Sequence, residues 1–403
     1  MKTQRRYSRG KPTTKKKFDH SSNKSGGPSR HRGRKGPELN ISSFINKADN
    51  SNVKEEVFVA DNAFADFALS PKVLNAIKNQ GYTAPTPIQD KVIKPILLGK
   101  DVVGLANTGT GKTAAFLIPL VEGILQDDNK RILIVTPTRE LAVQIDQELK
   151  RIANGMSIYS AICIGGENMN GQIRRLKQKN HFVIGTPGRL MDLLKRKALI
   201  LNQLTTVVLD EADRMLDMGF IKDIQFIMRY MPREKQTLCF SATMSKKIEA
   251  LINNFLKDPI TISVRNAITP KNIEQDIVKI KDKKRVDVLY DLLQQEEFSK
   301  VLVFGRTRHG VENLSRTLAR RGLRVESIHG NKSQTQRSRA LLKFKRNNVQ
   351  ALIATDVAAR GLHVDDITHV INYELPENYD DYIHRIGRTG RGVCKGKALT
   401  FVN

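Results

Sequence analysis

The sequence has no long apolar run that is free of charged residues. No stretch approaches the roughly 18 uncharged apolar residues that a membrane span needs. The basic residues at the start, Met1 to Arg6, are followed by no apolar segment, which argues against a secretory signal. We therefore expect a cytoplasmic protein with no membrane partner.

Cysteine is also scarce. The three cysteines, Cys163, Cys239 and Cys394, lie far apart and show no spacing that is typical of a metal site. Two of them fall in apolar runs that resemble strands. Buried, reduced thiols are the simplest interpretation, and they fit the same compartment.

Acidic residues are too few to balance the basic ones. The 403 residues include 68 Lys and Arg but 41 Asp and Glu, which gives a formal net charge of +27 and a pI near 10.0. Such an excess points to a polyanion as partner, and nucleic acid is the commonest. Because 39% of the residues are hydrophobic and the chain is too long for one ordinary core, we expect two domains and a tail.

The tail is predicted at residues 1–57. Residues 1–38 hold 13 Lys and Arg against two acids, and segments such as Ser25-Gly26-Gly27-Pro28 have too few apolar side chains to fold. We predict a disordered basic arm that lies along phosphates without sequence preference. A solubility tail is the alternative. The small apolar stretch from Asn40 to Ala48 has no function that we can assign.

From Phe64 onward, short apolar strand patterns alternate with helical ones, which predicts an α/β fold built on parallel sheets. The irregular segment 265–275 divides this pattern into two series and is predicted as a linker. We therefore predict one domain over residues 58–264 and a second over residues 276–403. The expected strands are Asp101 to Leu105, Arg131 to Val135, Ser157 to Ile164, Phe182 to Gly185, Thr206 to Leu209, Thr237 to Phe240, Lys300 to Phe304, Arg324 to Ile328, Gln350 to Ala354, His369 to Asn372 and Ala398 to Val402.

The first predicted strand leads into a glycine-rich turn, Ala106-Asn107-Thr108-Gly109-Thr110-Gly111-Lys112-Thr113, and then into a helix. This order is typical of a nucleotide phosphate loop. Gly109 and Gly111 let backbone N–H groups surround a phosphate, and the helix dipole adds positive potential. Lys112 would reach the terminal phosphates and the Thr113 hydroxyl would bind Mg²⁺. Ala106 replaces the usual first glycine, which costs little because the later glycines form the cradle.

Three acids follow the strand Thr206 to Leu209, in Asp210-Glu211-Ala212-Asp213. Ligands of open α/β sheets bind at the carboxyl edge, where these acids would lie. Acids packed this closely need a cation or basic groups to offset their repulsion. The alternative is an acidic helix start that the helix dipole favours.

Several turns carry further polar signals. Thr86-Pro87-Ile88-Gln89 is a capping box at a helix start, or Gln89 offers its amide to adenine. Gly165-Gly166 and the hydroxyl-Pro-Arg turns that contain Arg139 and Arg189 could bind phosphates along one sheet edge, although ordinary helix capping explains each turn alone. The segment from His384 to Arg391 holds three arginines with interleaved glycines, which favours a turn directed at an anion over solvated charges.

From Phe64 to its end the chain resembles the DEAD-box ATP-dependent RNA helicases of superfamily two. The eponymous residues are Asp210-Glu211-Ala212-Asp213, and the phosphate loop, Pro-Thr-Arg-Glu-Leu, Gly-Gly, Thr-Pro-Gly-Arg, Ser-Ala-Thr, Ala-Arg-Gly and His-Arg-Ile-Gly-Arg-Thr-Gly-Arg occur in the family's order. Bacterial cold-shock and degradosome-associated members are the most similar subgroup. The resemblance implies two tandem RecA-like domains.

The resemblance also implies roles for individual residues. Phe64 would stack on adenine and Gln89 would bind the base. ATP would further contact the loop residues Thr108, Gly109, Thr110, Gly111, Lys112 and Thr113. Mg²⁺ would be held by Thr113 and Asp210. The catalytic residues would be Lys112, Asp210, Glu211 and the arginine fingers Arg388 and Arg391. Coupling between the domains would use Asp213, Ser241, Thr243 and His384. RNA would contact Arg139, Gly166, Thr186, Arg189, Gly330, Thr355 and Arg360.

The function implied is RNA-stimulated ATP hydrolysis that remodels RNA and separates short duplexes, with ATP and Mg²⁺ as cofactors. RNA would bind without sequence preference, as single strand or short duplex, to a monomer whose protein partners would belong to ribosome assembly or RNA decay. Two alternatives stay open. One is an ATP-gated RNA clamp or annealing chaperone with little unwinding. The other is a motor that acts on DNA.

Three features depart from the family pattern. Asn107 replaces a glutamine, and His363 replaces an aspartate that is associated with the nucleotide ribose, so we expect weaker or pH-sensitive nucleotide contact there. The sequence ends at Asn403, where relatives usually continue into a closing helix. We expect either a trimmed second domain or a fragment.

Overall fold

The computed structural model describes residues 58, 60–107, 109–264, 273–280, 283–359, 364, 366–390 and 396–402. The predictions about the arm at 1–57, and about Thr108, Arg360, His363, Arg391 and Cys394, lie outside the described residues.

The N-terminal sheet domain is built on a parallel sheet with the strand order β3-β4-β2-β5-β6-β1-β7. All of its strand pairs are parallel. β1, β2, β4 and β5 are buried throughout, as their continuous apolar runs predict. The strands are β1 (Val102–Leu105), β2 (Ile132–Val135), β3 (Ser160–Cys163), β4 (Phe182–Gly185), β5 (Thr206–Leu209), β6 (Gln236–Ser241) and β7 (Ile260–Ser263).

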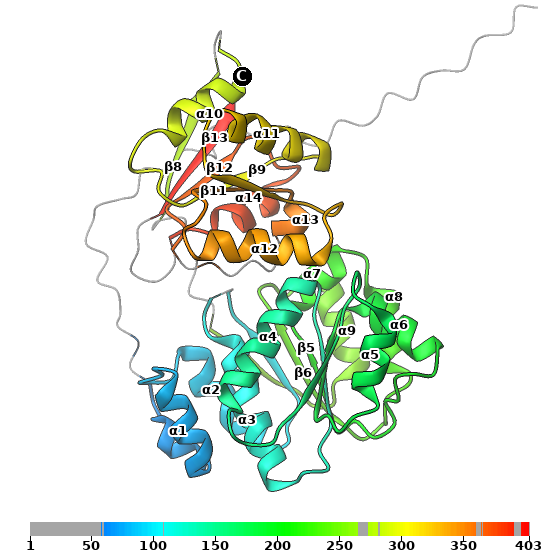
Figure 1. The fold of residues 1–403 in the computed structure, drawn as a ribbon. Coiled ribbons are helices and arrows are strands. Elements are labelled where there is room, and N and C mark those ends of the chain that lie inside the picture. The colour runs from blue at the N-terminus through cyan, green and yellow to red at the C-terminus, as the bar shows by residue number, and fades with distance from the viewer. Residues whose placement is uncertain are drawn as a thin grey trace, which may run out of the picture. The chain divides into compact units, whose positions relative to one another are not determined.

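Helices cover both faces of this sheet (Figure 1). One apolar core joins the sheet to α1, α2, α3 and α4, and a second joins its other face to α6, α7, α8 and α9. The helices and the short 3-10 turn before them are η2 (Phe64–Phe67), α1 (Pro71–Asn79), α2 (Pro87–Leu97), α3 (Lys112–Gln126), α4 (Arg139–Ile152), α5 (Met169–Leu176), α6 (Pro187–Lys195), α7 (Ala212–Asp217), α8 (Ile221–Met228) and α9 (Lys246–Phe255).

The C-terminal sheet domain repeats this plan with the strand order β10-β11-β9-β12-β13-β8, again all parallel. Its strands are β8 (Ile273–Lys279), β9 (Val301–Phe304), β10 (Val325–Ile328), β11 (Ala351–Ala354), β12 (His369–Asn372) and β13 (Gly396–Val402). Its helices are α10 (Arg285–Leu293), α11 (Arg308–Arg320), α12 (Gln334–Lys345), α13 (Asp356–Ala359) and α14 (Tyr379–Ile386). One core contains α10 and α11, and the other contains α12 and α13.

The predicted α/β class with two parallel sheets is confirmed, and every strand expected from the sequence is present to within a few residues at each end. Sequence patterns did not reveal β7 and β8. β7 is an edge strand with mostly exposed side chains, and β8 contains three consecutive polar residues, Glu274, Gln275 and Asp276, so neither has the apolar run of a buried strand. β8 begins at Ile273, within the segment predicted as linker.

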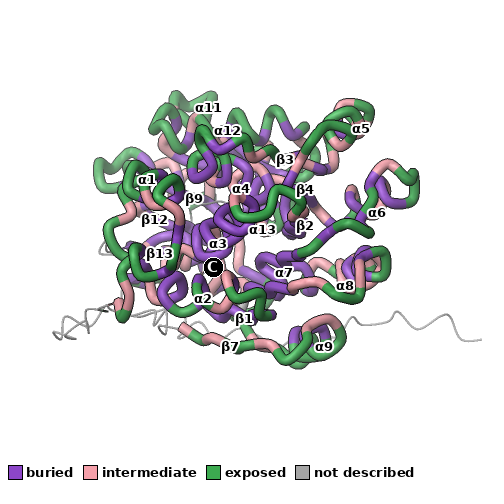
Figure 2. The backbone as a smooth tube through the Cα atoms, turned by 90° about the horizontal axis from the view of Figure 1, so that it is seen from below, coloured by how far each residue is buried: buried purple, intermediate pink, exposed green. Residues whose placement is uncertain are grey.

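Figure 2 shows the consequence for burial: strands such as β2, β4 and β9 lie in the interior, while the edge strand β7 and the outer sides of helices such as α5, α9 and α11 are exposed. Among the described residues, no helix is both long and apolar enough to cross a membrane. The two described cysteines, Cys163 and Cys239, are free and buried, and burial raises the pKa of each thiol to about 12.

Candidate functional site

The strand order sorts the predicted site residues along the carboxyl edge of the N-terminal sheet. The phosphate loop follows β1, and Ser241 ends the adjacent strand β6. Asp210 follows β5, the next strand. Beyond it, the residues predicted to contact RNA follow β2, β4 and β3 in turn. Nucleotide and RNA candidates therefore occupy opposite halves of one edge, with the acids between them.

The phosphate loop has the conformation that its glycines predict. Gly109 and Gly111 both have φ at +86°, in the left-handed region, and Gly111 caps α3. The Lys112 ammonium donates to the Ala106 carbonyl at 2.8 Å and is 7% exposed. The Thr110 hydroxyl donates to the Asn107 carbonyl at 2.8 Å. These contacts hold the turn open at the start of a helix, where backbone N–H groups and the dipole attract an anion.

Gln89 is tied to this loop. Its Oε1 accepts the Thr86 N–H at 3.0 Å, as a capping box requires, and its Nε2 donates to the Gly111 carbonyl at 3.1 Å. A Cβ on Gly111 would meet the Gln89 amide nitrogen at 2.6 Å, so the close approach needs glycine there. Gln89 thus positions the phosphate loop, and its contact with adenine stays a prediction.

Phe64 is buried in the core beside the start of this domain, with its ring 6.4 Å from those of Phe67 and Tyr82. The Asp90 carboxylate fastens the preceding segment by accepting the Asp61 N–H at 3.0 Å and the Asn62 amide at 2.7 Å. No sequence pattern indicated this role for Asp90, because only the fold brings residues 28 positions apart into contact.

The acids after β5 are buried and differ in their partners. Asp210 is 3% exposed, and burial raises its pKa to about 7, although Lys112 opposes the shift and Glu211 adds to it. Glu211 has φ at +51°, an uncommon conformation for a residue with a side chain, and its Oε2 lies 3.1 Å from Arg214 Nη1. A buried carboxylate with a raised pKa is stabilised in its charged form by a cation.

This arrangement fits Mg²⁺ bound as in other phosphate-loop proteins, where one hydroxyl, one aspartate and the phosphates hold the ion. Thr113, at the start of α3, lines the same pocket as Asp210 and Lys112. The part of the chain that the structure describes has no cluster of three or more His, Cys, Asp or Glu that would hold a metal by itself. An ion held jointly by Thr113, Asp210 and a nucleotide needs no such cluster.

The third acid, Asp213, has a separate set of contacts. Its Oδ2 accepts the N–H groups of Ala242 and Thr243, each at 3.0 Å, and the Thr243 hydroxyl at 3.3 Å. The Ser241 hydroxyl donates to the Thr243 carbonyl at 2.8 Å. Asp213 therefore joins the segment after β5 to the Ser-Ala-Thr segment after β6. The predicted link from Asp213 to His384, which lies on α14, stays a prediction.

On the other half of the edge, Arg139 opens α4 and its guanidinium lies against the backbone of Gly165 and Gly166. Gly166 has φ at +78°, so a side chain there would be both strained and in collision with Arg139. Arg189 donates to the Glu167 carbonyl at 3.3 Å and to Gln172 Oε1 at 2.9 Å. Thr186, the N-cap residue of α6, lies on the adjacent turn. Two arginines and the N-termini of two helices, α4 and α6, therefore lie on the same part of the carboxyl edge of this sheet.

The C-terminal sheet contains a matching arrangement that sequence patterns revealed only in part. Arg308 opens α11 after β9, and its Nε lies 3.3 Å from where a Cβ on Gly330 would be. Arg308 also donates to Asn331 Oδ1 at 2.9 Å. Gly330 and Thr355, both predicted to contact RNA, follow the neighbouring strands β10 and β11. Arg308 was not recognisable from sequence, because its only signal is a threonine followed by an arginine at a helix start.

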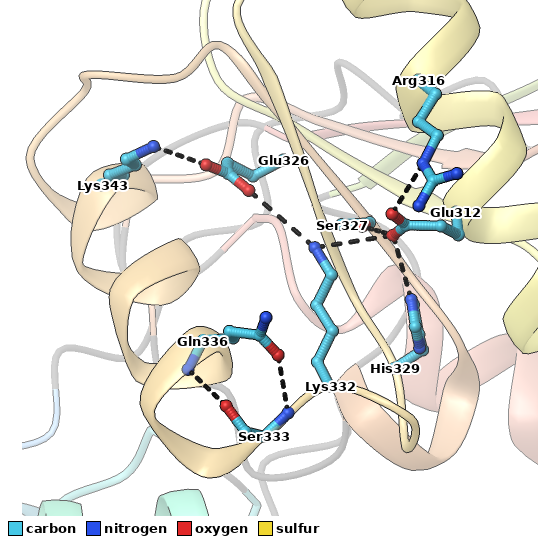
Figure 3. A network of polar contacts seen from close by, with 9 residues as sticks. All are labelled: Glu312, Arg316, Glu326, Ser327, His329, Lys332, Ser333, Gln336 and Lys343. Carbon is cyan, nitrogen blue, oxygen red and sulfur yellow. Dashed lines mark hydrogen bonds and ion pairs between the residues drawn. The ribbon is translucent and has the colours of Figure 1, made fainter.

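A network of charged side chains surrounds the turn that contains Gly330 (Figure 3). Glu312 on α11 accepts from Ser327 Oγ at 2.6 Å, from His329 Nε2 at 3.1 Å and from Arg316 Nε at 3.0 Å, and Lys332 Nζ lies 3.6 Å away. The Ser327 bond and these basic neighbours lower the pKa of Glu312 to about 2. A carboxylate that is ionised near neutral pH therefore contacts residues on both sides of Gly330.

The arginines of α14 and the turn after it have different roles. Arg385 is 2% exposed and binds both carboxylate oxygens of Asp356, at 2.6 and 2.8 Å, and the Glu374 carbonyl at 2.7 Å. Its guanidinium also lies 5.0 Å from the Phe304 ring centroid. Arg385 is thus a structural link between α13, α14 and the end of β12. Arg388, predicted as an arginine finger, lies one turn further on and is 3% exposed.

Comparisons with known proteins agree with this geometry. Residues 86–251 match the DEAD/DEAH box helicase domain, and residues 284–393 match the helicase conserved C-terminal domain. The chain is 43% identical over 341 residues to the ATP-dependent RNA helicase CshA of Limosilactobacillus reuteri, covering 84% of this chain and 69% of that protein. It is 45% identical over 341 residues to the DEAD-box ATP-dependent RNA helicase CshA of Geobacillus kaustophilus, covering 84% and 73%.

A solved structure is similar in the same way. Dbp5 of S. cerevisiae bound to RNA and ADP BeF3 matches with a TM-score of 0.75 and 29% identity, over 85% of this chain and 89% of that one. The match spans both of the sheets described above. The chain therefore belongs to the DEAD-box family of ATP-dependent RNA helicases.

Proposed function

We propose that this protein hydrolyses ATP in response to RNA and uses closure of its two sheet domains to separate short RNA duplexes and remodel RNA–protein complexes. One observation carries the proposal. The phosphate loop and the acids lie on the N-terminal sheet, whereas the predicted arginine finger Arg388 follows α14 of the C-terminal domain. Hydrolysis then requires the two domains to meet.

The N-terminal domain supplies the ATP site. Gly109, Gly111 and Lys112 hold the phosphates through backbone N–H groups and one ammonium. Thr113 and Asp210 would hold Mg²⁺, which supplies positive charge that offsets the charge on the phosphates. Glu211, fixed by Arg214, orients the attacking water and accepts its proton.

The C-terminal domain completes the site on closure. Arg388, with Arg391 beyond the described residues, stabilises the charge that develops on the transferred phosphoryl group. Asp213 holds the Ser-Ala-Thr segment in place for contact with His384. RNA that spans both sheet edges favours the closed state, so ATP and RNA bind cooperatively.

The RNA path follows the arginines and helix N-termini at the two edges. In the N-terminal domain it uses Arg139, Gly166, Thr186 and Arg189, and in the C-terminal domain Gly330, Thr355 and Arg360. Contacts of this type bind phosphate and sugar and carry no sequence information. A closed path that fits only a bent single strand would separate a short duplex locally. The Dbp5 structure, bound to RNA and ADP BeF3, supports simultaneous binding of both ligands by this fold.

The change Glu211→Gln tests the proposal. The amide keeps an acceptor for Arg214 but loses the base, so ATP binding persists while hydrolysis falls about 10²-fold or more. RNA then stays bound in a long-lived complex, measured as a slow dissociation rate with ATP present. Glu249→Gln on the exposed side of α9 is the matched control and leaves both rates unchanged. Normal ATP turnover by Glu211→Gln would refute this role.

Duplex release distinguishes the proposed activity from the alternatives. Short RNA duplexes are incubated with the full chain, with and without ATP, and with a form that lacks residues 1–57. ATP-driven release in both forms supports the helicase. Annealing without ATP that disappears with the arm, and no ATP-driven release, supports the RNA chaperone. Equal stimulation of ATPase activity by DNA and RNA supports a DNA motor.

A further inference from the structure

The N-terminal domain has a second pocket on the edge of its sheet that carries none of the site residues. This pocket has a volume of about 550 Å³ and lies where β2, β4 and β5 begin. Arg131 and His181 directly precede β2 and β4, and Leu204 lies two residues before the start of β5. Because the strands are parallel, the pocket lies at the amino edge, opposite Asp210 and Arg139.

The floor of the pocket is apolar. Val183, Leu199 and Leu204 are each 5% exposed and line it together with the half-buried Leu176. Ile200, which also lines the pocket, is 69% exposed and adds apolar surface beside this floor. A floor of this kind suits an apolar side chain from a partner.

The rim is basic. Arg131, Lys177, Lys179 and Lys197 line the pocket, and none of the described residues in its lining is acidic. Two of these charges are already engaged: Lys179 lies 2.6 Å from Asp128, and Arg131 donates to the Asp128 and Lys130 carbonyls. Lys177 and Lys197 form no ion pair with any residue that the structure describes. Both are exposed and can meet carboxylates of a ligand.

The backbone conformation of Lys197 also supports a binding role for this pocket. Lys197 follows the C-cap of α6 with φ at +55°, where glycine is the favoured residue. A lysine in the left-handed region is less stable than a glycine, because its Cβ lies too close to the neighbouring carbonyl oxygen. The Lys197 side chain lines the pocket. A residue that is unfavourable for the local backbone conformation therefore supplies one of the two lysine charges that have no ion-pair partner among the described residues.

We propose that this pocket docks an acidic segment of a partner protein, in which a bulky apolar side chain enters the floor and flanking Asp or Glu residues pair with Lys177 and Lys197. The partner would bind while ATP and RNA occupy the carboxyl edge, because four-residue strands separate the two edges by about 13 Å. The pocket would tether the helicase to an assembly without blocking its site.

Nucleic acid suits this pocket less well. Proteins that hold single strands stack bases on aromatic side chains. The one aromatic ring among the described lining residues is His181, which is 1% exposed and already stacks on Tyr159 at 6.2 Å. An apolar floor also gives phosphates no partner.

Selection of peptides tests the proposal. A phage-displayed library of random twelve-residue peptides is selected on the full chain, and a recovered peptide is labelled for affinity measurement. We expect peptides with Leu, Ile, Met or Phe between acidic residues, and a loss of about tenfold in affinity for Lys177→Glu and for Lys197→Glu. Lys72→Glu, a charge reversal at an exposed position on α1, is the matched control and keeps the affinity.

Lys197→Gly separates ligand binding from structural effects. Glycine relieves the left-handed conformation, so the unfolding midpoint rises while the peptide affinity falls. A peptide set without acidic character, or equal binding by the two charge reversals and the wild type, overturns the proposal. So does displacement of the peptide by single-stranded RNA, together with weaker RNA binding by Lys177→Glu, because the pocket then serves RNA.

Discussion

The two sheet domains share one layout and differ in the segments that come after corresponding strands. By position in the sheet, β10, β11, β9, β12, β13 and β8 correspond to β3, β4, β2, β5, β6 and β1. The strands β2 and β9 are both followed by a threonine that caps a helix, Thr138 and Thr307, and then by an arginine whose guanidinium lies over a glycine after the edge strand.

The other half of the carboxyl edge differs between the two domains. β1 leads into the phosphate loop, whereas no glycine lies between Lys279 at the end of β8 and Arg285 at the start of α10. β5 leads into three buried acids, whereas β12 leads into Tyr373 and Glu374. The arginine-over-glycine arrangement therefore belongs to both domains, whereas the phosphate loop and the buried acids belong to the N-terminal domain. Substitutions in each domain test this division.

The largest effect is expected from Arg388, the contribution of the C-terminal domain to hydrolysis. Arg388→Ala removes a charge that stabilises the transition state, so RNA-stimulated kcat falls about 10³-fold. Affinity for a fluorescent ATP analogue stays near that of wild type, because the phosphate loop is intact. A loss of nucleotide binding equal to the loss of kcat would remove Arg388 from this role.

Lys112→Ala removes the ammonium group that the N-terminal domain contributes to the proposed ATP site. Without the ammonium the phosphates lose a contact and hydrolysis falls about 10²- to 10³-fold. Nucleotide affinity falls as well, which distinguishes this variant from Arg388→Ala. RNA binding without nucleotide is measured as the control and stays unchanged, because both arginine-over-glycine arrangements remain. Unaltered nucleotide affinity would contradict the assignment.

The pair Arg139→Ala and Arg308→Ala tests the shared arrangement. If both arginines contact the RNA backbone, each change weakens RNA binding about tenfold and lowers the salt dependence of binding by about one unit. Both effects are measured by titration with single-stranded RNA at several salt concentrations. Equal losses support the correspondence. An effect of Arg139→Ala alone would confine this arrangement's function to the N-terminal domain.

A smaller effect is expected from a substitution of Glu312, which lies on α11 in the C-terminal domain. Its pKa is about 2, below its ordinary value of 4.5, so its ionised form stabilises the fold above about pH 4.5 and this contribution is lost as the pH falls toward 2. Glu312→Gln therefore destabilises the protein by about 1–3 kcal/mol near pH 7 and by less at lower pH.

Unfolding midpoints between pH 7 and pH 3 measure this difference. The matched control is Glu326→Gln, which removes the carboxylate that pairs with Lys343 at 2.6 Å and approaches Lys332 at 4.0 Å. We expect a smaller loss for Glu326→Gln, because two lysines are its only ion-pair partners among the described residues. A Glu312→Gln penalty that does not change with pH would contradict the interpretation of the network.

Local patterns in the sequence were sufficient for the fold class and for locating the phosphate loop and the acids at the ends of strands. Continuous apolar runs located the buried strands, and the phosphate loop and acids followed two of them directly. The strand pattern could not reveal β7 or β8, because edge strands with exposed or polar side chains have no such run. It also could not show that Gln89 uses both ends of its amide within the protein.

By itself, the sequence determined which residue types follow each strand, because a strand end and the turn after it are neighbours in the chain. Tertiary structure decided which of these ends lie side by side, since strand order is set by pairing between distant segments. That order placed Arg308 over Gly330 and Glu312 beside His329, and it put the predicted nucleotide contacts and the predicted RNA contacts on opposite halves of one edge. It also created the pocket at the opposite edge, whose lining comes from three separate segments.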